Sequence, residues 1–134
     1  MSDDTTGATA TTSRPGLLRT LAHRLAGDDD VLPVEGQLPP FTGATSWLNG
    51  DPLTPEGLRG RVVLVDLWTY TCINWLRTFP YIRAWSKKYA GHGLTVIGAH
   101  TPEFGFEHDL DNVIGRSRDL GVHYPIAVDS DYGV

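Results

Sequence analysis

Two hydrophobic patterns follow each other in the middle of the chain. Residues 62–65 (V-V-L-V) form an unbroken apolar run, which Asp66 and Trp68 interrupt. A run without alternation is typical of a parallel strand that is covered on both faces. From Ile73 onward, apolar residues recur every three or four positions, at 73, 76, 79, 82, 85 and 89. This spacing predicts a helix, which we expect to end at Gly91.

The only cysteine lies at the junction of this strand and this helix. Cys72 follows a short turn that contains Thr69 and Thr71. The carboxyl ends of parallel strands form the edge where sites of α/β sheets lie, and the unpaired N–H groups of a helix N-terminus stabilise an anion. A thiolate is such an anion. Cys72 is therefore a candidate nucleophile.

The residues that follow continue an α/β pattern. Residues 94–99 (L-T-V-I-G-A) predict a second buried strand, so that strand, helix and strand form a right-handed unit with parallel strands. Residues 109–120 predict a second helix with an Asp at its start and Gly121 after its end. Residues 124–128 predict a third, short strand.

Several polar residues come directly after the second predicted strand. Because parallel strands end at one edge, His100, Thr101 and Glu103 are expected near Cys72, and His100 and Glu103 are candidate neighbours of its thiol. His108 is the other histidine that could converge there. No pair of ligands has the i, i+4 helical spacing of a zinc site, so no metal site is predicted.

The beginning of the chain differs from the rest in composition. Residues 1–16 are polar and predict disorder, and residues 17–26 have the leucine spacing of a short amphipathic helix. We therefore expect a leader over residues 1–30 and a folded domain over residues 31–134. The sequence predicts neither a secretory signal nor a membrane span, and a cytoplasmic location is the resulting expectation.

Charge and cysteine count argue against several functions. The net charge of −5 disfavours nucleic acid and anionic membranes as partners. A single cysteine excludes an internal disulfide and a multi-cysteine zinc site. The chain has no Ser/His/Asp or glycine-rich phosphate signature, and no tightly bound cofactor is predicted.

The segment around Cys72 resembles the active-site stretch of thioredoxin-fold proteins, and in particular the TlpA/DipZ-like redoxins, of the AhpC/TSA-redoxin type, whose motif is W-x-x-x-C-x-x-C. Asp66 lies six residues before Cys72, Trp68 four before and Pro80 eight after. In thioredoxins these positions hold a buried acid, a packing tryptophan and a helix-kinking proline. The similarity extends over roughly residues 31–134 and implies an α/β thioredoxin-like fold that begins with a β-hairpin.

This chain departs from the family pattern at two places. Trp75 stands where the family has its second cysteine, so the motif reads C-I-N-W. After residues 124–128 the chain has no counterpart of the family's terminal β-β-α portion, which contains a cis-proline loop. We therefore expect a C-terminally incomplete domain with an uncovered sheet edge, either as a fragment or as a native short protein that a partner covers.

The resemblance implies a thiol-dependent oxidoreductase or antioxidant protein of cell redox homeostasis, and a single cysteine leaves it two chemistries. Cys72 can form a mixed disulfide with a low-molecular-weight thiol or a target protein, which an external thiol or a thioredoxin-type reductant then resolves. Alternatively, Cys72 can reduce a peroxide and become a sulfenic acid. T-Y-T-C is similar to the T-x-x-C of peroxiredoxins, in which the threonine, here Thr69, aligns the peroxide, although the upstream proline of that motif is absent.

A redox-inactive binding or scaffold module of the same fold is the alternative. Trp75 is expected beside the sulfur, where desolvation disfavours the thiolate that the helix N-terminus favours. Asp66, inside a buried run, must be hydrogen-bonded or protonated. Thr69 and Thr71 either donate to the sulfur or cap the helix. Three aromatic residues are expected in the core: Trp68, Tyr81 and Trp85. The residues expected to support Cys72 are Asp66, Trp68, Thr69, Thr71, Trp75 and Pro80.

Overall fold

The computed structural model describes residues 33–134. The chain divides into two units, Met1–Gln37 and Leu38–Val134, and every described helix and strand belongs to the second unit. The leader predicted for residues 1–30, with its amphipathic helix, lies outside the described residues, and the predicted domain start at residue 31 stays a prediction.

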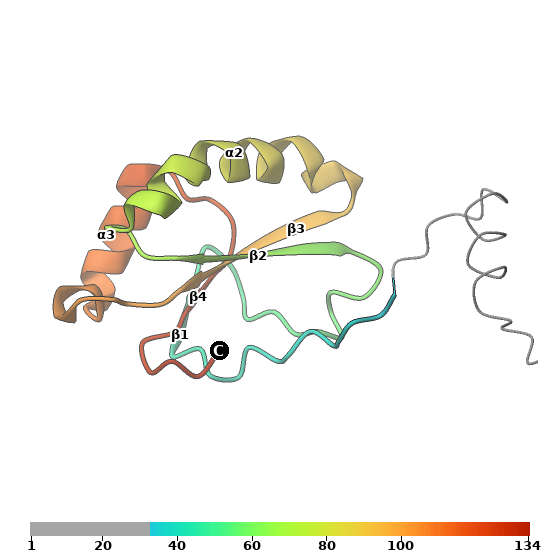
Figure 1. The fold of residues 1–134 in the computed structure, drawn as a ribbon, viewed down its shortest axis with the longest axis horizontal. Helices are drawn as coiled ribbons and strands as arrows, with labels where there is room; N and C mark the ends of the chain where they lie inside the picture. Colours follow the sequence, from blue (N-terminus) through green and yellow to red (C-terminus); the bar gives the residue numbers. More distant parts are fainter. Residues whose placement is uncertain (1–32) are drawn as a thin grey trace, which may run out of the picture. The chain divides into compact units, whose positions relative to one another are not determined.

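Four strands form one mixed sheet in the order β1–β4–β3–β2 (Figure 1). The elements in chain order are β1 (Ser46–Leu48), β2 (Val62–Trp68), α2 (Ile73–Tyr89), the 3₁₀ turn η1 (Ala90–His92), β3 (Leu94–His100), the 3₁₀ turn η2 (Gly105–Glu107), α3 (Leu110–Leu120) and β4 (Ile126–Val128). This α/β architecture agrees with the predicted thioredoxin-like fold class.

The predicted strand–helix–strand unit is present as β2, α2 and β3. β2 and β3 run parallel, from Val62 opposite Leu94 to Trp68 opposite His100. β4 adds to the other side of β3 in parallel, and β1 pairs antiparallel with β4. The segment before β2 therefore contributes a strand to the main sheet and not the N-terminal β-hairpin that was expected.

Strand β2 is longer than the apolar run that predicted it, and it is less covered. Asp66 and Trp68 belong to β2 and do not end it, because alternation turns both toward the face that α2 covers. β2 pairs only with β3 within the described sheet, so it is an edge strand. Val62 is 68% exposed, so the expectation of cover on both faces of residues 62–65 was wrong at this position. Leu67, which lies beyond that run, is 72% exposed.

The core has two parts, one on each face of the sheet. The cluster beneath α2 contains Trp68, Trp75 and Phe79, and the cluster on the opposite face gathers around Phe41, Leu58, Ile97 and Ala127. Trp68 is in the core as predicted. Tyr81 and Trp85 are 65% and 47% exposed, and their predicted burial was wrong, because α2 turns Trp75 and Phe79 inward.

Glycines in the left-handed conformation end both helical segments. Tyr89 is the last residue of α2, and the 3₁₀ turn η1 follows directly. Gly93, with φ of 89°, ends η1, two residues beyond Gly91, where the helix was predicted to end. Asp109 caps α3 by accepting a hydrogen bond from the Asp111 N–H at 2.9 Å, and Gly121 with φ of 75° ends this helix as predicted. None of the helices within residues 33–134 combines the length and apolarity needed to cross a membrane.

Candidate active site

Cys72 occupies the N-cap position of α2, at the end of the turn that follows β2. Its N–H donates to the Thr69 carbonyl at 3.2 Å, and its own carbonyl accepts from the Leu76 N–H at 2.9 Å. Cys72 is half-buried, and its side chain packs against the core cluster that contains Trp75. No side chain caps α2, so its first N–H groups are not engaged by a capping side chain.

Trp75 is built into the core and bound to the buried acid. Its indole N–H donates to Asp66 Oδ2 at 2.9 Å, and its ring lies 4.7 Å from the Trp68 ring and 4.6 Å from the Phe79 ring. Only 4% of Trp75 is exposed. Cys72 packs against the same cluster, and the expected position of the indole beside the sulfur stays a prediction. The polar edge of the indole is directed at Asp66.

Asp66 holds a second donor that the sequence did not suggest. The Tyr124 hydroxyl donates to the same Oδ2 atom at 2.7 Å. Burial raises the pKa of Asp66, and the hydrogen bonds from Trp75 and Tyr124 act in the opposite direction. Burial and the neighbouring carboxyl also raise the pKa of Tyr124, so its hydroxyl keeps its proton and donates at neutral pH. The expectation that Asp66 is hydrogen-bonded is confirmed.

A second carboxylate, that of Glu107, anchors the turn before Cys72. It accepts from the Thr71 hydroxyl at 2.5 Å and from the N–H groups of Glu103 and Phe104 at 2.7 and 3.0 Å. Its side chain is fully buried, and burial opposes its ionisation. Hydrogen bonds from Thr69, Thr71 and the two N–H groups outweigh this effect and lower the pKa of Glu107 to about 2. Glu107 is therefore an anion that fixes the loop after β3 to the turn.

His100 lies fully buried at the end of β3. Its Nε2 is 3.5 Å from the Thr69 hydroxyl oxygen, its ring meets Trp68 edge-on at 5.1 Å, and it stacks on Tyr70 at 6.0 Å. Its Nδ1 has no partner within the described residues. Burial lowers the pKa of His100, with an opposing effect from Glu107, so the imidazole is neutral at pH 7.

The expected neighbours of the thiol thus divide into two groups. Thr69, Thr71 and His100 come together around Glu107, whereas Glu103 contributes only its backbone N–H and keeps an exposed side chain. The Thr101 N–H donates to the Trp68 carbonyl at 2.9 Å. The threonines neither cap α2 nor leave their hydroxyls unused. Two further residues of interest lie elsewhere: His108 is exposed beside Tyr132, and Pro80 lies inside α2.

Sequence reasoning missed Glu107 and Tyr124. A signal for Glu107 exists, because a glutamate three residues into a helical turn commonly reaches back to the N–H at its start, here that of Phe104. Tyr124 has no such signal, since its partner Asp66 lies 58 residues away. Over the described range, no group of three or more His, Cys, Asp and Glu could hold a metal ion.

This strand–turn–helix arrangement around a partly exposed thiol defines a thioredoxin-like protein. A solved thioredoxin-like protein in its oxidised form superposes with a TM-score of 0.59 at 28% identity, over 66% of this chain and 60% of that one. The thioredoxin domain of a thiol-disulfide oxidoreductase from Bacteroides vulgatus gives a TM-score of 0.52 at 15% identity, over 72% of this chain and 68% of that one, and supports the fold alone.

Curated relatives point to the same class. The chain is 45% identical over 100 residues to protein DipZ of Mycobacterium bovis, which covers 72% of this chain and 14% of DipZ. It is 36% identical over 95 residues to SUPPRESSOR OF QUENCHING 1 of Arabidopsis thaliana, over 70% of this chain and 9% of that protein. YkuV, a thiol-disulfide oxidoreductase of Bacillus subtilis, is 25% identical over 97 residues, covering 72% of this chain and 65% of YkuV.

These comparisons support a thioredoxin-like protein that is similar to the redoxins over about 70% of its length. It spans about one seventh of the length of DipZ and less of the Arabidopsis relative. No protein-family model matches the chain.

Proposed function

We propose that the protein is a monothiol oxidoreductase that works by thiol–disulfide exchange at Cys72. The proposal is carried by the position of Cys72. This residue is half-buried at the N-cap of α2, and no side chain accepts a capping hydrogen bond from the first N–H groups of the helix. A helix N-terminus stabilises a thiolate through its unpaired N–H groups. Similarity to thioredoxin-like oxidoreductases supports the same chemistry.

The exchange balances with Cys72, one disulfide substrate and one external thiol. The Cys72 thiolate attacks one sulfur of a disulfide, forms a mixed disulfide and releases the other half as a thiolate. Because Trp75 occupies the position of a resolving cysteine and is buried on Asp66, an external thiolate must then attack the mixed disulfide. This second step releases the Cys72 thiolate and leaves a new external disulfide. The proposed donor is a low-molecular-weight thiol or a thioredoxin-type protein, as a cytoplasmic setting would supply.

Peroxide reduction is the less favoured version of this chemistry. The threonine of a T-x-x-C motif must direct its hydroxyl at the peroxide, but the Thr69 hydroxyl lies near His100 Nε2 and hydrogen-bonds Glu107. Thr69 is 2% exposed, so a peroxide at Cys72 would have to displace these contacts. Cys72 is expected to form sulfenic acid with hydrogen peroxide, in the absence of any disulfide, more slowly than it forms a mixed disulfide with a disulfide substrate.

The test uses glutathione disulfide and the full chain. Incubation of the reduced protein is expected to give one mixed disulfide with glutathione at Cys72, and excess glutathione is expected to release it again. Cys72→Ser is the blank in both steps. If the native protein forms no adduct while the denatured protein does, the thiol is inaccessible and the proposal fails.

A redox-inactive binding module is the second candidate, and the burial of Trp75 favours it. The indole fills the space between Trp68 and Phe79 and pairs with Asp66, which is a packing role that needs no thiol. In that case, Cys72→Ser would leave every property of the protein except thiol titration unchanged. Reversible glutathione exchange at a rate above that of the unfolded chain would exclude this candidate.

A further inference from the structure

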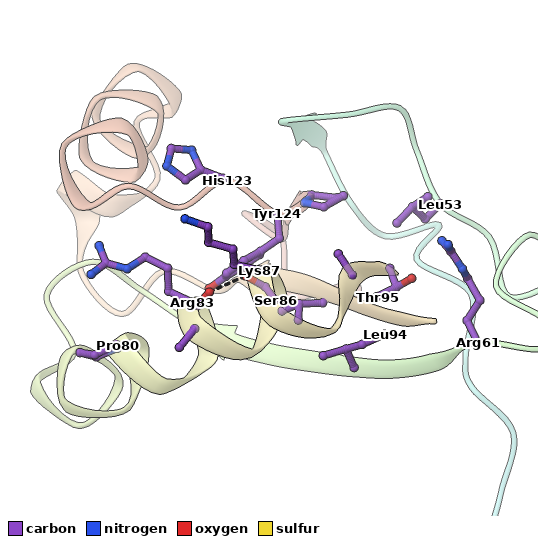
Figure 2. A pocket seen from close by; sticks show the side chains of 14 residues that line it. Leu53, Arg61, Pro80, Arg83, Ser86, Lys87, Leu94, Thr95, His123 and Tyr124 are labelled. Carbon is purple, nitrogen blue, oxygen red and sulfur yellow. Dashed lines mark hydrogen bonds between the residues drawn. The ribbon is translucent and has the colours of Figure 1, made fainter. Parts of the chain in front are cut away.

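A groove of about 890 Å³ lies along the second half of α2, away from the Cys72 end of the helix. α2 forms one wall with Pro80, Arg83 and Lys87, and the start of β3 contributes Leu94 and Val96 (Figure 2). The volume lies within the ~300–1,000 Å³ typical of pockets for small molecules. Neither the redoxin chemistry nor the network around Cys72 uses this groove.

The charged side chains that line the groove are all basic. Arg83 and Lys87 extend from α2, Arg61 comes from the segment before β2, and His123 from the segment after α3 (Figure 2). Arg83 Nη1 and His123 Nε2 approach each other at the end of α3, because both lie within 4 Å of the position that a Cβ on Gly121 would occupy. No Asp or Glu of residues 33–134 lines the groove.

This concentration of positive charge is unusual for the chain. Its net charge is −5, with 16 acidic residues against 11 Lys and Arg, yet three of those 11 line this one groove. Positively charged side chains at the edge of a groove attract anionic ligands. The guanidinium groups of Arg61 and Arg83 can each make paired hydrogen bonds to a phosphate or a carboxylate.

Apolar side chains line the rest of the groove. Val96 is 3% exposed and belongs to the core, and Leu94 packs against the same cluster. The Tyr124 ring also lines the groove, while its hydroxyl is already engaged by Asp66. Thr95, another lining residue, has a buried hydroxyl without a hydrogen-bond partner in the described part of the chain. A bound ligand would therefore contact charge at the rim and apolar surface below it.

We propose that this groove binds a small anionic ligand that has a phosphate or carboxylate group for the basic rim and an apolar body for the floor. The site is independent of Cys72, so it stands whether or not the thiol is redox-active. Each part of the ligand contributes: the anion is attracted to the cations, and burial of the apolar body adds stabilisation in proportion to its area.

The test is an NMR titration of the full, isotope-labelled chain at low salt with phenyl phosphate as the probe. Benzoate replaces the phosphate by a carboxylate, inorganic phosphate supplies the anion alone, and phenol supplies the ring alone. We expect saturable shifts at residues of the groove with phenyl phosphate or benzoate, and weaker binding of phosphate and of phenol. Added salt should weaken binding of the anions.

Adjacent residues provide matched controls. Lys87→Gln removes a rim cation, whereas Lys88→Gln removes the same charge one residue further along α2, outside the lining. Arg61→Gln and Arg59→Gln form a second pair. The lining variants are expected to weaken phenyl phosphate binding roughly threefold to tenfold, and the controls less than about twofold. Absence of saturable shifts in the groove, or equal effects within each pair, would overturn the proposal.

Discussion

Replacing Glu107 by glutamine is expected to destabilise the turn that carries Cys72. The carboxylate of Glu107 holds this turn through the Thr71 hydroxyl and holds the loop after β3 through the N–H groups of Glu103 and Phe104. Glutamine keeps the shape and one oxygen acceptor but loses the charge. Hydrogen bonds to a charged group contribute about 1.5–3 kcal/mol each, against about 0.5–1.5 kcal/mol for neutral pairs.

The pKa of Glu107 gives the magnitude. A fall from 4.5 to about 2 corresponds to an upper limit of about 3 kcal/mol of stability at neutral pH. Because this pKa is lower in the folded than in the unfolded protein, the stabilisation is fully present above about pH 4.5 and is lost as the pH falls toward about 2. The amide retains part of the hydrogen bonding, so Glu107→Gln should cost about 1–3 kcal/mol at pH 7.

The assay is urea denaturation of wild type and variant over a range of pH. The variant is expected to be less stable at pH 7 and to approach wild type near pH 2.5, since wild type alone loses the Glu107 contribution. Glu103→Gln is the matched control, because that side chain is exposed and only its backbone N–H takes part. A Glu107 variant as stable as wild type at pH 7, or an equal gap between them at both pH values, would refute the reasoning.

Three further substitutions test the packing around Asp66 and its neighbours. Trp75→Cys should lower the free energy of unfolding by about 3–5 kcal/mol, because the smaller side chain leaves the indole site empty. Mild oxidation of this variant should pair the new cysteine with Cys72 and leave no titratable thiol. Two titratable thiols after oxidation would contradict this pairing. Tyr124→Phe should cost about 1–3 kcal/mol in urea denaturation, because Asp66 keeps only the Trp75 donor; no loss would contradict the role of the hydroxyl. Gly98→Ala places a Cβ 2.8 Å from Trp68 Nε1 and 3.1 Å from Tyr124, so its free energy of unfolding in urea should fall by about 1–3 kcal/mol. Gly115→Ala, in α3 with open space around it, should instead be neutral or stabilising.

Local patterns in the sequence predicted the parts of the fold that depend on local physics. The apolar run before Asp66 and the three-to-four spacing after Ile73 predicted the β2–α2–β3 unit. A strand buried on both faces favours an unbroken apolar run, and a helix buried on one face favours apolar residues every three or four positions. Gly121 predicted the end of α3, and the two aspartates Asp109 and Asp111 were the candidate caps for its start, since a cap and a left-handed residue act within one turn.

Contacts between distant segments escaped prediction. The family resemblance implied a hairpin before β2, and nothing near β1 in the sequence indicates that β4, about 80 residues later, is its partner. The helical stripe was also misjudged, because Trp75 lies outside the pattern and yet turns inward to Asp66, while Trp85 within the pattern is exposed. The buried carboxylate of Asp66 needs hydrogen-bond donors, and the indole N–H of Trp75 supplies one from the inward face of α2. This contact exists only in the packed structure, so the spacing of apolar residues does not reveal it.

The most direct test of the account is the rate at which iodoacetamide alkylates Cys72 in the native protein at neutral pH, compared with the rate in denaturant. Cys72→Ser supplies the blank. The account predicts that the native thiol reacts at least as fast as the unfolded one, because it is partly exposed at an uncapped helix N-terminus. A thiol that reacts only after unfolding would contradict the proposed chemistry and leave the fold as a binding module.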